Sequence, residues 1–274
     1  MALKKYTHST FLGLIALSFV SSSFSLQAAT KVITADEVNW GYLNPARGDK
    51  SPGAADLWGD RTKNTATGML VRFKEGFSSP PHIHNITYRG IVIDGEMHND
   101  DPDAKAMWMP VNSYWTQPAG EVHITAANQK ANMIYLEIDE GPYLVKPSSE
   151  HFDNGERPIN LHRDNQVWLH NTDLINVESD GVKAVYLWGD TQAKYGTMIK
   201  LPEGFDGVLE STGNEFRSVV IQGEVSLKEK RNGVKSLLPG SYIESDAPSV
   251  HHIKNSSDSD VTLYVRTNAP LSIK

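Results

Sequence analysis

Three histidines have the residue type and the spacing needed to bind a metal ion. His82 and His84 are two positions apart, and in a β-strand that spacing directs both imidazoles to the same face. Pro80 and Pro81 precede them, which suits the first residues of a strand and disfavours a helix. His123 follows a Pro-Ala-Gly turn at residues 118–120, which can bring a third imidazole across to the pair. Three protein ligands leave positions on a divalent metal open, as in catalytic sites rather than closed structural ones.

The sequence around these histidines indicates β-structure. A β-branched run at residues 91–93 ends in Asp94-Gly95, a preferred two-residue hairpin turn. Similar short runs recur, with Gly, Pro, Asn and Asp between them. They cover residues 67–73, 87–93, 106–109, 113–116 and 131–138. No window shows an eleven-residue helical stripe. We therefore expect an all-β protein made of sandwiches or jelly rolls.

The composition limits the kinds of site and partner. The 274 residues include no cysteine, which excludes disulfides, thiolate metal sites and a cysteine nucleophile. A metal site must then use histidine, carboxylate, hydroxyl or backbone oxygen. The formal net charge is −7, and no basic block is interleaved with aromatic residues. Nucleic acid is therefore not an expected partner.

The first 29 residues have the pattern of a signal peptide. Lys4 and Lys5 give a positive start, and an apolar stretch at residues 11–20 is too short to span a bilayer. Small residues follow, and cleavage is expected after Ala28 or Ala29. The alternative is a buried N-terminal helix. The charged start and the small-residue end favour export to a periplasm, or secretion, without membrane insertion.

The remaining chain contains one pattern twice, at an offset of about 128 residues. Trp40 corresponds to Trp168 and His123 to His251. A repeat of this length indicates a duplicated fold unit. We predict an N-terminal domain at residues 30–146, a polar and turn-rich linker at 147–165, and a C-terminal domain at 166–274.

Two motifs in the first repeat resemble those of the cupin superfamily. The first, G-x5-H-x-H-x(3,4)-E-x6-G, is matched at Gly76, His82, His84 and Gly95, with Tyr88 in place of the glutamate. The second, G-x5-P-x-G-x2-H-x3-N, is matched at Pro118, Gly120 and His123. Asn112 replaces its first glycine, and its last asparagine is shifted from residue 127 to 128.

Two further stretches, residues 43–49 (LNPARGD) and 97–102 (MHNDDP), look like those of exported two-cupin proteins of a domain-of-unknown-function family. The resemblance covers essentially the whole chain after the leader. It implies two tandem cupin (RmlC-like jelly-roll) barrels, that is, a bicupin.

By the same resemblance, His82, His84 and His123 bind one divalent metal in the N-terminal barrel, with Fe(II) expected first and Mn, Ni or Zn as alternatives. With Tyr88 at the glutamate position, the three neutral imidazoles keep the full +2 charge of the metal, which favours an anionic ligand. The implied activity is that of a dioxygenase-type oxidoreductase acting on a small oxygen-rich or anionic compound. The alternatives are a cupin lyase or isomerase, a non-catalytic metal-dependent binding or sensing protein, and a barrel that the metal only stiffens.

Other residues are candidates for the same site. Tyr88 can hydrogen-bond a bound ligand or move a proton, or it can simply pack in the barrel. His98 has only Ser226 as its counterpart in the second repeat, which makes it a candidate pocket residue. A carboxylate can also join the metal, and the candidates are Glu96, Asp100, Asp101 and Asp103.

The second repeat lacks the histidine pair. Glu210, Thr212 and Phe216 stand where the first repeat has His82, His84 and Tyr88, and only His251 remains. We expect a barrel kept for packing, with a weak site from Glu210, Glu215 and His251 as the alternative. Two barrels in one chain resemble a fused cupin dimer, so the protein is expected to be a monomer or a homodimer that binds a small molecule.

Overall fold

The computed structural model describes Met1 and residues 30–129, 131–172, 175–190, 193–229 and 233–274. The predicted signal peptide, residues 1–29, lies outside this part except for Met1. The described chain is nearly all β, which confirms the predicted class. Its helices are three short 3-10 turns, η1 (Pro45–Lys50), η2 (Ser148–Glu150) and η3 (Arg163–Asn165). None is long and apolar enough to cross a membrane.

The strands fall in two sets along the chain. The first set is β1 (Lys31–Ile33), β2 (Gly41–Tyr42), β3 (Gly53–Trp58), β4 (Thr67–Phe73), β5 (His82–His84), β6 (Tyr88–Asp94), β7 (Glu96–Asp100), β8 (Met109–Pro110), β9 (Tyr114–Gln117), β10 (Ile124–Ala127), β11 (Asn132–Ile138), β12 (Val145–Pro147) and β13 (Ile159–Leu161). The second set is β14 (Ile175–Val177), β15 (Lys183–Gly189), β16 (Tyr195–Leu201), β17 (Asp206–Ser211), β18 (Phe216–Gln222), β19 (Val225–Glu229), β20 (Gly233–Leu237), β21 (Tyr242–Ser245), β22 (Ser249–Asn255), β23 (Val261–Thr267) and β24 (Leu271–Ile273).

The N-terminal half is built around a seven-stranded sheet in the order β13-β9-β6-β11-β4-β3-β2. A three-stranded sheet, β10-β7-β8, and a two-stranded sheet, β12-β5, complete it. Alternate residues of these strands form one apolar core, to which β4 contributes Met69 and Val71, and β7 contributes Met97. This alternation follows from the two-residue period of a strand. The short strand β5, with its two histidines, lies outside the large sheet.

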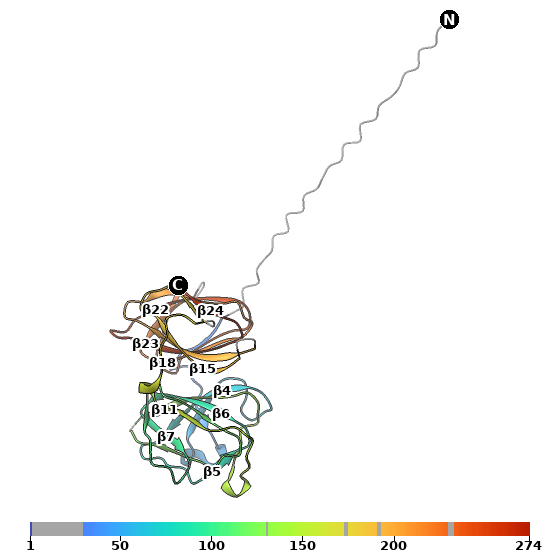
Figure 1. Ribbon diagram of the computed structural model, residues 1–274, viewed down its shortest axis with the longest axis vertical. Helices are drawn as coiled ribbons and strands as arrows, with labels where there is room; N and C mark the ends of the chain where they lie inside the picture. Colours follow the sequence, from blue (N-terminus) through green and yellow to red (C-terminus); the bar gives the residue numbers. More distant parts are fainter. Residues whose placement is uncertain (2–29, 130, 173–174, 191–192, 230–232) are drawn as a thin grey trace.

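The C-terminal half consists of two six-stranded sheets. Their orders are β1-β21-β18-β23-β16-β15 and β14-β24-β17-β22-β19-β20. Apolar residues of both sheets form a second core, exemplified by Ile199 of β16 and Leu209 of β17. Figure 1 shows this half, drawn in orange and red, stacked on the green and blue N-terminal half.

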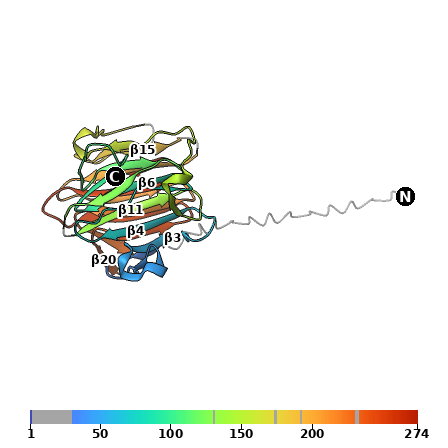
Figure 2. The same ribbon diagram turned by 90° about the horizontal axis from the view of Figure 1, so that it is seen from below.

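A third apolar core joins the two halves. It combines side chains of the seven-stranded sheet, such as Leu70 and Ile91, with side chains of the first six-stranded sheet, such as Met198 and Val219. Each of these two sheets is therefore covered on both faces. The view in Figure 2 shows strands β3, β4, β11 and β6 of the N-terminal sheet running side by side.

Two short strands pair with strands that lie outside their own predicted segments, that is, outside the N-terminal domain or the linker in which the sequence pattern placed them. Strand β1 pairs with β21 of the C-terminal half, Ile33 lying opposite Tyr242. Strand β13, from the predicted linker, pairs with β9 of the N-terminal half. Each half of the protein thus includes one strand from a segment that lies outside the two matching repeats. The domain limits at residues 146 and 166 stay a prediction.

The predicted pair of closed barrels is not confirmed. Within the described residues, each half is made of separate open sheets that face each other, and none of the sheets closes on itself.

Candidate metal centre

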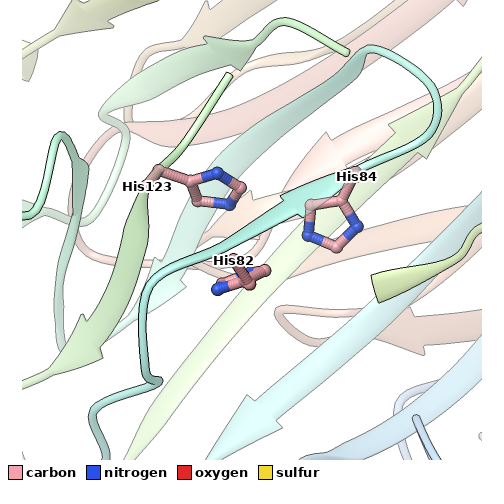
Figure 3. A group of neighbouring side chains, drawn as sticks. All are labelled: His82, His84 and His123. Carbon is pink, nitrogen blue, oxygen red and sulfur yellow. The ribbon is translucent and has the colours of Figure 1, made fainter. Parts of the chain in front are cut away.

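The three predicted histidines lie together in the N-terminal half. His82 and His84 begin and end β5, and His123 immediately precedes β10. Two backbone hydrogen bonds of 3.0 Å join His82 and His123 as an antiparallel bridge. All three rings are buried, and their nearest ring nitrogens lie within 4.8 Å of one another. Figure 3 shows the rings turned toward one common space.

Backbone carbonyls fix the orientation of each ring. A carbonyl oxygen can only accept a hydrogen bond, so the Nδ1 atom facing it carries the proton. The Nε2 atom of each neutral ring then keeps its lone pair for the common space, the orientation found in metal-bound histidines. The acceptors are Pro80 O at 2.9 Å from His82, Leu144 O at 3.1 Å from His84, and Glu121 O at 3.0 Å from His123.

Burial also sets the protonation state of the three rings. It lowers the pKa of His82, and it lowers the pKa of His84 well below the ordinary value, with the neighbouring His123 and His82 adding to the effect. Burial and the nearby His82 lower the pKa of His123 to about 3. The rings are therefore neutral at pH 7, the form in which imidazole binds a metal.

Tyr88 lies beside the cluster with its proton directed away from it. The hydroxyl donates to Asn99 Oδ1 over 2.8 Å, and Thr125 Oγ1 donates to the same oxygen. Asn99 in turn donates to Gln117 Oε1, which fixes the orientation of both amides. The Tyr88 oxygen lies 3.4 Å from His123 Nε2. Two lone pairs thus face each other with no proton between them, which fits a cation or a hydrogen-bond donor in the adjoining space.

Tyr143 also contacts the cluster, with its ring 5.9 Å from that of Tyr88, and the motif comparison missed it. Its hydroxyl donates to His84 Nε2 over 3.2 Å, and its ring stacks on that imidazole at 4.4 Å between centroids. Burial, with Tyr88 nearby, raises the pKa of the Tyr143 phenol well above its ordinary value. One sequence signal could have identified it: the residue 128 positions later is Leu271, so this aromatic ring is specific to the histidine-bearing repeat.

A cavity of about 800 Å³ opens onto the cluster. His82, His84, Tyr88 and Tyr143 line it, whereas His123 lies behind them, fully buried. The rest of the wall is largely apolar and includes Val71, Phe73, Phe77, Trp115, Ile134 and Leu136. Its size is in the range of pockets that enclose a small organic molecule.

The structure does not bring His98 to this cavity. Along β7, Met97 belongs to the apolar core and Asn99 contacts Tyr88, so these neighbours point inward. Because strand residues alternate, His98 points to the opposite face. There its Nδ1 accepts a hydrogen bond from Met107 N, and its ring lies 6.0 Å from that of Trp108. His98 was a candidate pocket residue, and the structure places it outside the lining of this cavity.

No carboxylate joins the three histidines in the described part of the chain. Glu96 accepts a hydrogen bond from Asn128, and Asp100 accepts one from Asn160. Asp101 accepts one from the backbone of Asp103. The four carboxylates proposed as additional ligands thus lie away from the cluster.

The alternative site in the second half is not assembled. His251 is buried, with its ring stacked 4.5 Å from that of Phe216. Glu210 pairs with Lys274, and Glu215 pairs with Arg266. Strand register explains the separation: Leu209 lies opposite His251, so the neighbouring Glu210 points to the other face.

A comparison with protein families finds one whose model matches nearly the whole described chain. Residues 31–274 match the family described as a domain of unknown function, DUF4437. None of the curated proteins matches the chain.

Solved structures show the same fold at low identity. A protein of Nostoc punctiforme PCC 73102, provisionally described as a dioxygenase, is 15% identical, with a TM-score of 0.66 over 88% of this chain and 83% of its own. The formate complex of Lactobacillus farciminis oxalate decarboxylase is 11% identical, with a TM-score of 0.55 over 87% of this chain and 86% of its own. A mutant of Bacillus subtilis oxalate decarboxylase, 11% identical, has a TM-score of 0.52 over 87% and 77% of the two chains. The chain therefore belongs to the DUF4437 family, and its fold is cupin-like, similar to that of these solved structures.

Proposed function

We propose that this protein is a metal-dependent oxidoreductase of the dioxygenase type, which acts on a small oxygen-rich or anionic compound. It binds one divalent metal ion through His82, His84 and His123. Fe(II) is the first choice, and Mn, Ni or Zn are alternatives, since imidazole ligands suit several first-row metals. One observation carries the proposal: three buried, neutral imidazoles direct their Nε2 atoms into one space that opens onto a cavity.

A metal held by this neutral donor set would supply Lewis acidity and, if it is redox-active, a means of reacting with oxygen. The residues of the chain supply the rest of the site. The carbonyl-bound Nδ1 atoms hold the rings in position, so little reorganisation accompanies binding. The apolar side chains of the cavity wall, such as Phe73 and Leu136, limit the access of water to the cavity.

Two tyrosines have different roles in this proposal. Tyr88 presents an oxygen lone pair, because its proton is held by Asn99, and so it accepts a hydrogen bond from a ligand. Tyr143 occupies the Nε2 lone pair of His84. Its hydroxyl must turn away when that nitrogen binds a metal, and it can then donate to an oxygen atom of the substrate.

The proposal includes export. The positive and apolar segments of the first 29 residues support removal of a signal peptide and a periplasmic or extracellular location. We propose that the mature protein acts on its small molecule as a monomer or a homodimer.

Elemental mass spectrometry of the mature protein, purified without chelator or affinity histidines, tests the proposal. We expect about one metal ion per chain and its loss in His84→Ala. His151→Ala is the matched control, because His151 is an exposed histidine outside the cluster. Oxygen uptake by the iron-loaded protein in the presence of candidate anions then tests the reaction type. Turnover without oxygen uptake would favour a lyase or isomerase.

Two results would refute the metal site. Protein that binds no iron, manganese, nickel or zinc after loading would contradict it. So would metal binding that His84→Ala leaves unchanged.

A further inference from the structure

The sequence stretch 43–49 forms part of the cavity wall. Leu43, Asn44, Pro45 and Arg47 all line the cavity that also contains His82 and His84. Within this stretch, residues 45–49 belong to the short turn η1 (Pro45–Lys50). Arg47 is exposed to solvent, whereas His84 is buried. The stretch therefore lies on the solvent side of the cavity, at its entrance.

Local hydrogen bonds fix the shape of this entrance segment. Asn44 Oδ1 accepts from Ala46 N over 3.1 Å, and Asn44 N donates to Ser51 Oγ over 2.9 Å. Gly48 has a φ of 52°, which favours glycine at this point of the turn. Lys74 Nζ donates to Asp49 O over 2.7 Å and anchors the end of the segment. The backbone that carries Arg47 is thus held in place, which reduces the entropy lost when its side chain binds a ligand.

The cavity has an unusual charge pattern for an acidic protein. Of the residues that the structure describes, its lining includes Arg47, Arg61 and Lys146 but no Asp or Glu. Arg61 is paired with Asp56 at 2.7 Å, and Lys146 with Glu150 at 2.8 Å. The Arg47 backbone N–H donates to Asn44 O over 3.1 Å, but the Arg47 guanidinium forms no ion pair or hydrogen bond with any other described residue. A cation that is not neutralised by the protein thus remains at the entrance of a cavity whose inner end holds neutral imidazoles.

We propose that Arg47 binds the carboxylate of an organic acid whose apolar part packs against Phe73, Phe77 and Leu136. The other end of the molecule faces the histidine cluster. The planar guanidinium suits a carboxylate, which it can bind with two parallel hydrogen bonds, and a single cation matches a single negative charge. The inference rests on the proposed function, because it takes the histidine cavity as the substrate site and narrows the substrate to an organic acid with an apolar body.

Isothermal titration calorimetry with two matched probes tests the inference. The probes are 3-phenylpropanoate and its neutral amide, 3-phenylpropanamide, titrated into both zinc-loaded and metal-free protein. The variants are Arg47→Ala and Arg47→Lys. Lys50→Ala is the control, because Lys50 is an exposed cation of the same turn that does not line this cavity. Thermal melts verify that each variant is folded, as expected for changes at exposed positions.

We expect the acid to bind about tenfold to a hundredfold more tightly than the amide, in both metal states. Arg47→Ala removes this preference, Arg47→Lys keeps part of it, and Lys50→Ala leaves it unchanged. Higher salt reduces the preference, because the guanidinium is exposed.

Three outcomes would overturn the inference. The first is an acid preference that survives in Arg47→Ala. The second is an acid preference that occurs only in the zinc-loaded protein, which would place the anion on the metal. The third is wild-type protein that binds neither probe more tightly than Arg47→Ala does. Failure of the proposed function gives a different result. In that case the protein binds no iron, manganese, nickel or zinc after loading, while the acid preference still depends on Arg47.

Discussion

Lowering the pH destabilises the metal-free protein through its buried histidines, and His123 allows the size of the effect to be worked out. Burial lowers the pKa of His123 from 6.5 to about 3. In the folded state the ring therefore stays neutral far below pH 6.5, whereas in the unfolded state it takes up a proton near that pH. The unfolded state binds more protons, so the stability contributed by the neutral ring is lost as the pH falls from 6.5 toward 3.

The magnitude follows from proton linkage. Below its unfolded pKa, such a ring costs about 1.4 kcal/mol of folding stability per pH unit. About 1.5 units below that pKa, near pH 5, His123 alone accounts for about 2 kcal/mol. The pKa values of His82 and His84 are lowered in the same direction, so they add to the loss.

Urea denaturation of metal-free protein at pH 7 and pH 5 measures the effect. We expect wild-type protein to lose about 2 kcal/mol more over this interval than His123→Gln, which has no titrating ring at that position. His151→Ala, a change at an exposed histidine, should show the wild-type dependence. If His123→Gln and wild type lose the same stability between the two pH values, the ring is not held neutral by burial and the reasoning is refuted.

Two further changes test the interface and the second tyrosine. Arg266→Met leaves Glu137, which lies 2.6 Å from it and is buried between the two halves, without its nearest cation, so we expect a loss of about 3–5 kcal/mol in urea denaturation. A loss below about 1 kcal/mol would contradict this expectation. Tyr143→Phe removes the hydroxyl that occupies His84 Nε2, so zinc affinity, measured by competition with a chelating dye, should stay the same or rise by about 1 kcal/mol. A fall in affinity would mean that the hydroxyl helps to hold the metal.

The local signals for the site were sufficient to predict the histidine cluster but not all of its surroundings. His82 and His84 share a face because two-residue spacing in a strand requires it, and the bridge to His123 follows the predicted turn. His98 lies outside the cavity because it is on the other face of β7 from Met97 and Asn99. Both faces of this strand are buried, so the sequence did not show which of them faces the histidine cluster. Tyr143 reaches the cluster from a segment without a motif, so only the packed structure reveals its contact with His84.

The same limit applies to the fold. The run at residues 67–73 coincides with strand β4, and the run at 131–138 nearly coincides with β11, because β-branched and aromatic residues suit long, buried strands. The pairing of β1 with β21 could not be predicted in this way. A three-residue strand carries too little pattern to specify a partner more than 200 residues away, so that choice depends on packing in the whole protein.

Tyr88, which stands where the cupin motif has a glutamate, determines the charge of the surroundings of the histidine cluster. A carboxylate there would neutralise part of the charge of a bound metal, whereas Tyr88 is neutral and its partners Asn99, Thr125 and Gln117 are neutral too. The polar surroundings of the cluster therefore provide hydrogen bonds but no compensating negative charge. Burial raises the pKa of the Tyr88 phenol, which further opposes its ionisation. The negative charge that a divalent metal favours would then come from the ligand. Among the described residues, the cavity leading to the cluster has the unpaired guanidinium of Arg47 at its entrance and no carboxylate in its wall. In the proposed site, the charge of a bound metal and that of Arg47 would both attract an organic anion into the cavity, where its carboxylate would bind Arg47.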